Sequence, residues 1–596
     1  MLSVFVTYHY FLGLRNLNII TETLREVKKN TGKSIDIELV PFEKEVFSKI
    51  FATGNTNSVF QFESGGMKKM LRQFRPESIE DIILLVAAYR PGPMQYLDSI
   101  IAVKHGRKKP EYVIPEMETI LGKTYGYPVY QEQIMQIFNK FAGFSLGESD
   151  IIRRLMSKKK TKEFAKYKDK FIDGLCENGA DRRKAEDFWT QMVDFSEYAF
   201  NKSHAAAYAF VAYYTAWLKC FYPAEYLCAV MNDTVFEKLG GLIADCRGFG
   251  VQVNPANINV SNAKFSTCKD GVVVGLGLIK GVASSASPII AERANGKFKS
   301  FTEFMLRTRA SKDVAENLIY AGAFDEFTRN RQALVDAVPE YCEILKKIKI
   351  KENILEAEST ATTEKEIEKE NAKKERAKEA INTLISNMNG ISVNLYGEEN
   401  LLVRLENEKE KIGAFISGHP LDTYGTPSDY KCTEINDLER QRNVSVMGII
   451  TDLRVVQRKS DNADLAFFNL EDQTGSIAVN CFTSTYAQFK DMIQSDGIVI
   501  ITGDCIEDID NITDETVLKI NAKSFKTIKA KKKTVVIEIE SGMDWVDRVE
   551  NMVKPFRAKD GMNLVAFDKM YGQFRNIDAQ VSADIMSLTE LNPRIV

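Results

Sequence analysis

The sequence has few of the residues that build metal sites or covalent cross-links. It holds four histidines and nine cysteines in 596 residues, and no two cysteines form a Cys-x-x-Cys pair. Neither a zinc site nor a disulfide framework is therefore predicted, and reduced thiols in a cytoplasmic protein are the simple interpretation. No run of about eighteen apolar residues is present, which excludes a membrane-spanning helix. The first ten residues lack the basic start of a secretory signal.

The overall composition shows no strong bias. Hydrophobic residues make up 44% and charged residues 27% of the chain, as in soluble globular proteins. The length predicts several domains, about four at the usual domain size. Lys and Arg number 79 against 82 Asp and Glu. Because the whole chain is nearly neutral, any cluster of one sign is a local feature.

Such a cluster of positive charge lies between residues 150 and 170. After Asp150, only Glu163 and Asp169 oppose it. A local basic cluster on a near-neutral chain indicates contact with the phosphates of nucleic acid or a nucleotide. The alternative is a solvated helix face, which is what most charge runs are. The nine basic residues are Arg153, Arg154, Lys158, Lys159, Lys160, Lys162, Lys166, Lys168 and Lys170.

A second polar group precedes a dense run of Ala, Tyr and Phe that ends at Tyr214. The group is Asn201, Lys202, Ser203 and His204. This pattern predicts the start of a buried helix, where free N–H groups carry a partial positive charge. Lys, Ser and His at that position favour a phosphate site. The alternative is a capped core helix with an incidental histidine.

Hydrophobic patterns divide the chain into regions. Alternation is typical of half-buried strands, and a run rich in Lys, Glu and Ala is typical of a solvated helix or a flexible linker. The regions are a mixed α/β start that ends in a strand at 57–62, a mostly helical part at 64–235, a mixed part at 236–330, a Lys/Glu/Ala-rich run at 343–388, strands of an OB-type barrel at 440–528 and a small α/β unit at 533–596.

Motifs in this order resemble the α subunits of bacterial DNA polymerase III, the C-family replicative polymerases. The similarity runs from about residue 11 to the end. The motifs are Phe11–Arg15, Val59–Ser64, Tyr89–Met94, Val129–Met135, Arg153–Lys160, Phe200–Tyr208 and Gly418–Asp422.

The resemblance implies a multidomain α+β fold. It has mostly helical fingers, a helix-hairpin-helix domain, an OB-type β-barrel and a small C-terminal α/β domain. The implied segments are a palm remnant at 1–50, fingers at 51–235, a helix-hairpin-helix clamp-binding domain at 236–345, a charged linker with a clamp motif at 346–439, an OB domain at 440–528 and a C-terminal domain at 529–596.

The function implied by the resemblance is template-directed DNA synthesis by a DNA-directed DNA polymerase. The implied partners are primed template DNA, single-stranded DNA, a deoxynucleoside triphosphate, a sliding clamp and other replicase subunits, with no membrane. The implied phosphate ligands are Arg90, Arg153, Arg154, Lys158, Asn201, Lys202, Ser203 and His204. The implied DNA contacts are Lys159, Lys160, Lys280, Gly281, Arg454, Arg458 and Phe467.

Two of these sites depart from the family pattern. The helix-hairpin-helix glycine pair is here Gly281 and Ala283, and an alanine is costly wherever φ is positive, so we expect a weaker backbone approach to DNA. The clamp peptide has Leu395 and Tyr396 as anchors, but Ser392 stands in place of the family glutamine. The alternative is an ordinary loop with two apolar residues.

In the OB domain, alternation allows only one of Phe467 and Phe468 to face a ligand.

Polymerases of this family hold Mg²⁺ with carboxylates of the palm. The residue before the Phe11–Arg15 motif, where one such carboxylate is expected, is Tyr10. A phenol is a poor substitute because hard cations prefer ionised oxygen ligands and tyrosine is protonated at neutral pH. We therefore expect no metal ligand, no catalytic residue and no activity from this chain alone. The alternative is a non-catalytic DNA-binding scaffold outside any polymerase.

Overall fold

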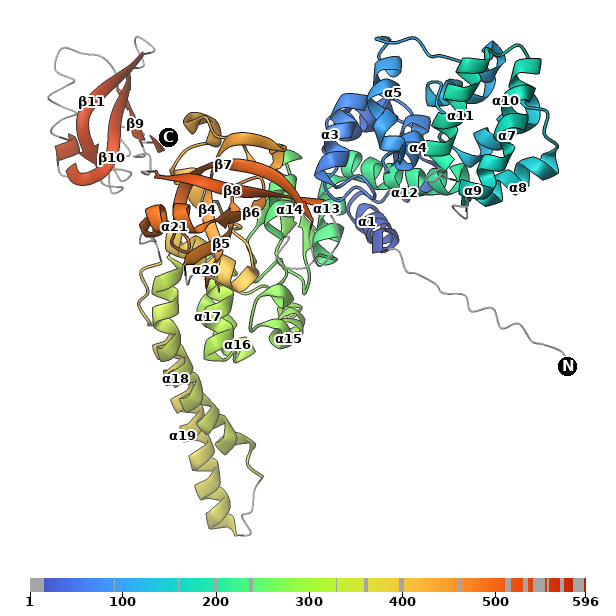
Figure 1. The fold of residues 1–596 in the computed structure, drawn as a ribbon. Coiled ribbons are helices and arrows are strands. Elements are labelled where there is room, and N and C mark those ends of the chain that lie inside the picture. Colours follow the sequence, from blue (N-terminus) through green and yellow to red (C-terminus); the bar gives the residue numbers. More distant parts are fainter. Residues whose placement is uncertain are drawn as a thin grey trace. The chain divides into compact units, whose positions relative to one another are not determined.

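The computed structural model describes residues 15–595, with gaps at 91, 158–160, 197–200, 235–238, 329, 359–362, 396–400, 459–462, 510–515, 529–533, 540–551, 555–556, 569–572 and 582–593. The chain forms two compact units, Met1–Gly397 and Glu398–Val596. Helices dominate the first unit, and a barrel and a small sheet dominate the second (Figure 1). The predicted multidomain α+β fold is confirmed. No helix of the described residues is long and apolar enough to cross a membrane.

Helix α12 (Lys202–Phe221) organises the first of two cores in the helical region. Its buried face carries the small residues Ala205, Ala209, Ala212 and Ala216, which let α4 (Ile79–Ala88) pack closely against it. Pro223 then starts the next helix, because proline fits a first helical position but cannot continue a helix. The other helices around this core are α1 (Arg15–Thr31), α2 (Lys44–Val46), α3 (Gly65–Phe74), α5 (Leu97–Lys104) and α13 (Pro223–Asn232).

The second core of this region is aromatic. Phe138, Phe164, Phe171 and Trp189 are buried and in ring contact, with Phe164 and Trp189 stacked at 4.8 Å between centroids. Such clusters gain from both area burial and ring geometry. They hold together α6 (Glu118–Leu121), α7 (Gln131–Phe141), α8 (Leu146–Ser157), α9 (Thr161–Phe164), α10 (Lys168–Glu177) and α11 (Arg182–Ser196).

The strand predicted at 57–62 is wrong. The segment is a series of turns in which Ser58 and Gln61 have positive φ values of 60° and 65°. Buried groups from distant helices fix it: the hydroxyl of Tyr226 donates to the Ser58 carbonyl at 2.5 Å, and Lys219 Nζ donates to the Asn57 carbonyl at 2.8 Å. No strand occurs anywhere in the described residues 15–60. Tertiary hydrogen bonds have overridden the local preference of an apolar and aromatic segment for strand.

The next region combines a small sheet with paired helices. The sheet order is β1-β3-β2, with β1 parallel to β3. Arg331 is fully buried and makes a bidentate pair with Asp325 at 2.8 and 2.6 Å, which fixes the start of a long helix. The elements are α14 (Leu239–Gly248), β1 (Gln252–Asn254), β2 (Ser266–Cys268), β3 (Gly271–Val273), α15 (Ala283–Arg293), α16 (Phe301–Thr308) and α17 (Lys312–Tyr320).

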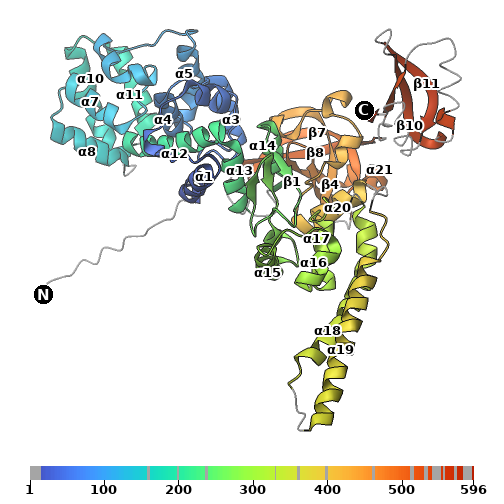
Figure 2. The same ribbon diagram turned by 180° about the vertical axis from the view of Figure 1, so that it is seen from behind.

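The Lys/Glu/Ala-rich run forms a helical hairpin rather than a flexible linker. Helices α18 (Arg331–Glu356) and α19 (Glu364–Asn389) lie side by side in both views (Figure 1, Figure 2). Thr363 and Glu366 form a capping box at the start of α19. The sequence analysis left a solvated helix and a flexible linker open for this run, and the structure agrees with the solvated helix. The segment boundaries implied by the resemblance stay predictions.

The second unit is built around a closed barrel with strand order β4-β5-β6-β8-β7. Strands β6 and β8 pair in parallel, and the remaining pairs are antiparallel. Buried alternate residues such as Phe468, Val479 and Ile501 fill its interior. The elements are α20 (Leu401–Ile412), β4 (Gln441–Gln457), β5 (Asp464–Glu471), β6 (Ser476–Cys481), α21 (Thr483–Phe489), β7 (Ile498–Ile509) and β8 (Thr516–Thr527).

The last element is a sheet with strand order β11-β10-β9-β12. Its strands β9 and β10 are parallel, while β11 and β12 pair antiparallel at the two edges. The strand predicted from residue 534 is therefore present. The bounds are β9 (Thr534–Ile539), β10 (Arg557–Asp568), β11 (Gln573–Val581) and β12 (Arg594–Ile595).

Candidate nucleotide and nucleic-acid interfaces

The start of α12 is capped from within the protein. The side-chain oxygen of Asn201 accepts the His204 N–H at 3.0 Å, as expected for an N-cap residue. The Lys202 N–H donates to both oxygens of Glu132, at 3.2 and 3.1 Å. A carboxylate is the kind of group that a helix N-terminus binds. At the helix start where the sequence predicts an anion site, the structure places an internal carboxylate, that of Glu132.

The side chain of Lys202 is also paired. Its Nζ lies 3.1 Å from Glu80 Oε2, and Lys123 Nζ lies 3.3 Å from the other oxygen of Glu80. Partial burial acts to raise the pKa of Glu80, but the hydrogen bonds and charges of Lys202 and Lys123 together hold that pKa below its ordinary value. The cluster therefore balances two carboxylates with two ammonium groups. An incoming phosphate has to compete with Glu132 and Glu80.

The remaining predicted side chains at this helix start face outward. Ser203 and His204 are exposed, and the His204 ring lies 4.4 Å from the ring of Tyr208 one turn further on. This ring contact with Tyr208 limits where the imidazole can point. Ser203 and His204 are thus accessible to a ligand at the end of α12.

Helix α8 presents the two predicted arginines. Arg153 and Arg154 each place a guanidinium nitrogen 2.8 Å from a different oxygen of Asp150. The hydrogen bond from Arg153 and the two positive charges lower the pKa of Asp150. The single carboxylate of Asp150 is thus shared by two guanidinium groups. Lys158, Lys159 and Lys160 lie outside the described residues.

Helix α7 connects these two sets. Glu132 in its first turn accepts the Lys202 N–H, and the body of α7 packs against α8. Arg90 lies elsewhere: it follows the last turn of α4, whereas Glu80, the partner of Lys202, is in the first turn. A ten-residue helix is about 15 Å long. Arg90 and Lys202 therefore lie at opposite ends of α4.

The helix-hairpin-helix turn has its glycine where the backbone requires one. Gly281 has φ +79°, and an added Cβ would lie 2.6 Å from Asn317 Nδ2. Ala283 is the first residue of α15, where φ is negative, so its methyl group causes no strain. The expected cost of alanine at this position is therefore wrong. Lys280 is exposed beside the turn.

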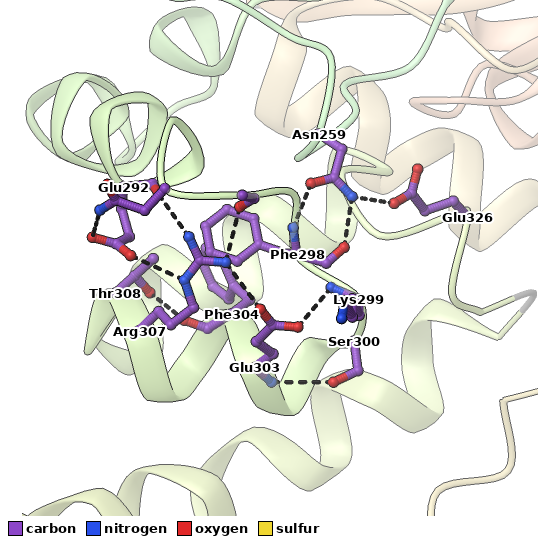
Figure 3. A network of polar contacts seen from close by, with 12 residues as sticks. Asn259, Glu292, Phe298, Lys299, Ser300, Glu303, Phe304, Arg307, Thr308 and Glu326 are labelled. Carbon is purple, nitrogen blue, oxygen red and sulfur yellow. Dashed lines mark hydrogen bonds and ion pairs between the residues drawn. The ribbon is translucent and has the colours of Figure 1, made fainter.

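A polar network holds the helices behind this turn, centred on Arg307 (Figure 3). Its guanidinium donates to Glu292 Oε1, Glu303 Oε1 and the Gly296 carbonyl, each at 2.9 Å, and to the Glu292 carbonyl at 2.7 Å. It also lies 4.5 Å from the centre of the Phe298 ring. These contacts fix α15 against α16. Arg307 is thus a positioning residue for the hairpin.

The predicted clamp segment contacts the residues between α17 and α18. The hydroxyl of buried Thr328 donates to the Leu395 carbonyl at 3.0 Å, and Leu395 is half-buried. Ser392 is exposed. Tyr396 lies outside the described residues, as does Tyr10. The role of the two anchors stays a prediction.

In the barrel, Phe467 and Phe468 lie on opposite faces, as alternation requires. Phe467 is 40% exposed and Phe468 is 4% exposed within the core. Arg454 on β4 lies directly opposite Phe467 on β5. The exposed Arg458 follows at the end of the same strand, where its N–H donates to the Ala463 carbonyl at 2.9 Å. Aromatic and basic groups therefore gather on one surface.

Sequence reasoning missed the two carboxylates at the start of α12. Glu132 lies 70 residues and Glu80 lies 122 residues from Lys202. The only local signal was the place of Glu132 within the Val129–Met135 motif. Nothing in the sequence pairs either carboxylate with that helix.

Comparison with known proteins agrees with this arrangement. Residues 16–179 match the bacterial DNA polymerase III alpha subunit finger domain, 250–334 a helix-hairpin-helix motif and 444–531 an OB-fold nucleic acid binding domain. DNA polymerase III subunit alpha of Aquifex aeolicus is 33% identical over 93% of this chain, and that of Xylella fastidiosa strain Temecula1 is 36% identical over 84%. The match to the Campylobacter jejuni subunit is 34% over 82%.

The chain thus carries a polymerase finger region together with a helix-hairpin-helix motif and an OB fold. It is homologous to the α subunit of bacterial DNA polymerase III over most of its length. It covers 46%, 42% and 40% of those three relatives, so it spans less than half the length of each.

Proposed function

We propose that this chain supplies the triphosphate-binding, DNA-binding and clamp-binding parts of a DNA-directed DNA polymerase. The observation that carries the proposal is the start of α12, where Lys202, Ser203 and His204 surround a helix end that already holds a carboxylate. A position that binds one anion suits a phosphate of similar charge. Arg153 and Arg154 lie on α8, which packs against α7, and they add positive charge for the rest of a triphosphate.

The proposal gives this chain no metal ligands. Mg²⁺ is expected for polymerases of this family, and it requires several oxygen ligands around one position. Among the described residues, no group of three or more His, Cys, Asp or Glu side chains is placed to hold a metal ion. These residues do not fit the ion, and the proposal contains no step that depends on it. The resemblance expects a carboxylate at position 10, and the tyrosine found there is a second reason to assign this chain no metal ligands.

The first test is triphosphate binding by the full chain, measured by calorimetric titration with a deoxynucleoside triphosphate. A hydrogen bond to a charged group contributes about 1.5–3 kcal/mol, so Arg154→Ala should weaken binding about ten- to a hundredfold. The control is Arg182→Ala on α11, which removes an exposed arginine paired with Asp173. Equal affinity of the Arg154 variant and the control would contradict the assignment.

The second test is primer extension by the chain alone, with Mg²⁺ and all four nucleotides. We expect binding of the primed template without extension. Extension that is lost on mutation of a residue of this chain would overturn the division of roles. A chain that binds neither DNA nor triphosphate would contradict the proposal as a whole.

A further inference from the structure

Two successive β-turns precede α3 and have no role in the sites described above. In the first turn, the Val59 N–H donates to the Thr56 carbonyl at 3.0 Å, and in the second the Phe62 N–H donates to the Val59 carbonyl at 3.0 Å. The third residues of the two turns, Ser58 and Gln61, have φ values of 60° and 65°. Glycine or asparagine is usual at a third turn position with positive φ, because other side chains are strained there.

Tertiary hydrogen bonds hold both turns against α12. Lys219 Nζ donates to the Asn57 carbonyl at 2.8 Å, and the Phe60 N–H donates to Thr215 Oγ1 at 3.3 Å. The backbone on the N-terminal side of Gln61 is therefore fixed in the absence of a ligand. A contact made from such a fixed position costs little conformational entropy.

The second turn adjoins a row of rings that leads to the start of α12. The Phe60 ring lies 5.2 Å from the Tyr208 ring, and the Tyr208 ring lies 4.4 Å from the ring of His204. Tyr208 follows Lys202 by about 9 Å along α12, at about 1.5 Å per residue. A triphosphate bound at Lys202 with its nucleoside directed along α12 therefore brings the nucleoside to Tyr208 and to the turn that contains Gln61.

Gln61 places an amide in this turn. The residue is exposed, and its side chain makes no hydrogen bond within the part of the chain that the structure describes. The side chain thus does nothing for the core that offsets its strained φ, and strained residues of this kind cluster at ligand sites. An amide offers two donors and an acceptor, which suit the hydroxyl of a sugar and the polar edge of any base. Phosphate is bound more strongly by Lys or Arg, so an uncharged amide favours the nucleoside.

We propose that Gln61 contacts the nucleoside part of a deoxynucleoside triphosphate whose phosphates lie at the start of α12. The inference rests on the proposed triphosphate binding by this chain, and it adds a residue that recognises the rest of the nucleotide. Lys219 and Thr215 act as positioning residues, since their hydrogen bonds hold the two turns.

The test is calorimetric titration of the full chain with dATP, with dTTP and with inorganic tripolyphosphate. One hydrogen bond contributes about two- to tenfold in affinity, so Gln61→Gly should weaken the binding of both nucleotides by that factor. The affinity for tripolyphosphate should be unchanged, because it has no nucleoside. Gln61→Asn keeps an amide and tolerates positive φ, so it should bind nucleotides more tightly than Gln61→Gly.

Ser58→Gly is the matched control, because it makes the same change at the third position of the other turn. Glycine adopts positive φ without strain, so both glycine variants should keep the fold, which urea unfolding checks. A fourth ligand, 2-deoxyribose 5-triphosphate, separates the sugar from the base. Weaker binding of this ligand to Gln61→Gly assigns the contact to the sugar, and a loss confined to dATP and dTTP assigns it to the base.

The outcomes separate this inference from the proposed function. If Gln61→Gly binds dATP as tightly as Ser58→Gly does, the contact is overturned and the triphosphate site stands. The same holds if Gln61→Gly loses equal affinity for dATP and for tripolyphosphate, since the change then acts on the phosphate site. A parent chain that binds neither ligand would contradict the proposed function and this inference together.

Discussion

Glu132→Gln is expected to tighten the binding of a triphosphate to this chain. Both oxygens of Glu132 lie within 3.2 Å of the Lys202 nitrogen, so a phosphate can take that N–H only if the carboxylate moves aside. Glutamine keeps a side-chain oxygen that can accept the N–H, so α12 stays capped. It removes the negative charge that opposes the ligand.

The size of the effect follows from Coulomb's law. Two unit charges about 5 Å apart interact with about 3 kcal/mol at an effective dielectric constant of about 20. Glu132 is half-buried, and solvent screening reduces this to about 1–2 kcal/mol. Because 1.4 kcal/mol is a factor of ten, the affinity should rise about five- to thirtyfold.

The assay is calorimetric titration of the full chain with inorganic tripolyphosphate, which isolates phosphate recognition from base recognition. Glu186→Gln on α11 is the control, since Glu186 is exposed and its removal changes the net charge equally. Lys202→Gln should have the opposite effect and weaken binding. If Glu132→Gln binds no tighter than the control, the start of α12 is not the phosphate site.

Three further predictions follow, two on residues that support these sites and one on the clamp anchors. Hydrogen bonds from Lys170 and from Ser145 lower the pKa of Glu148 to about 2. The stabilisation of α8 by ionised Glu148 should therefore be complete above the ordinary pKa near 4.5 and lost as the pH falls towards 2, and Glu148→Gln should cancel this pH dependence in urea unfolding. Arg307→Ala should destabilise α15 and α16 by about 2–4 kcal/mol in hydrogen exchange, whereas Arg309→Ala, which loses an exposed ion pair, should cost less than about 1 kcal/mol. Leu395→Ala with Tyr396→Ala should abolish a micromolar contact with the sliding clamp in a calorimetric titration and leave DNA binding unchanged; undiminished binding would place the clamp contact elsewhere.

Much of the fold could be predicted from local patterns. Alternating apolar residues predicted the barrel strands because one face of each strand must be buried. Asn201 predicted the start of α12 because its side chain caps free N–H groups. The ordered motifs predicted the finger, helix-hairpin-helix and OB regions, which the comparisons confirm.

The strand predicted at 57–62 shows where local patterns fail. The segment is rich in apolar and aromatic residues, yet Lys219 and Tyr226 hold it in turns by hydrogen bonds to its carbonyl groups. These donors are more than 150 residues away, at separations of 162 and 168. A local pattern carries no information about such partners.

The sequence by itself determined which elements form and which residues carry charge or aromatic rings. Only the tertiary structure placed Glu132 and Glu80 at the start of α12 and brought Phe60 to Thr215 across 155 residues of chain. The physical reason is that hydrogen bonds and ion pairs depend on distances of about 3 Å between atoms. Packing of whole helices and strands sets those distances, whereas neighbouring residues in the sequence do not.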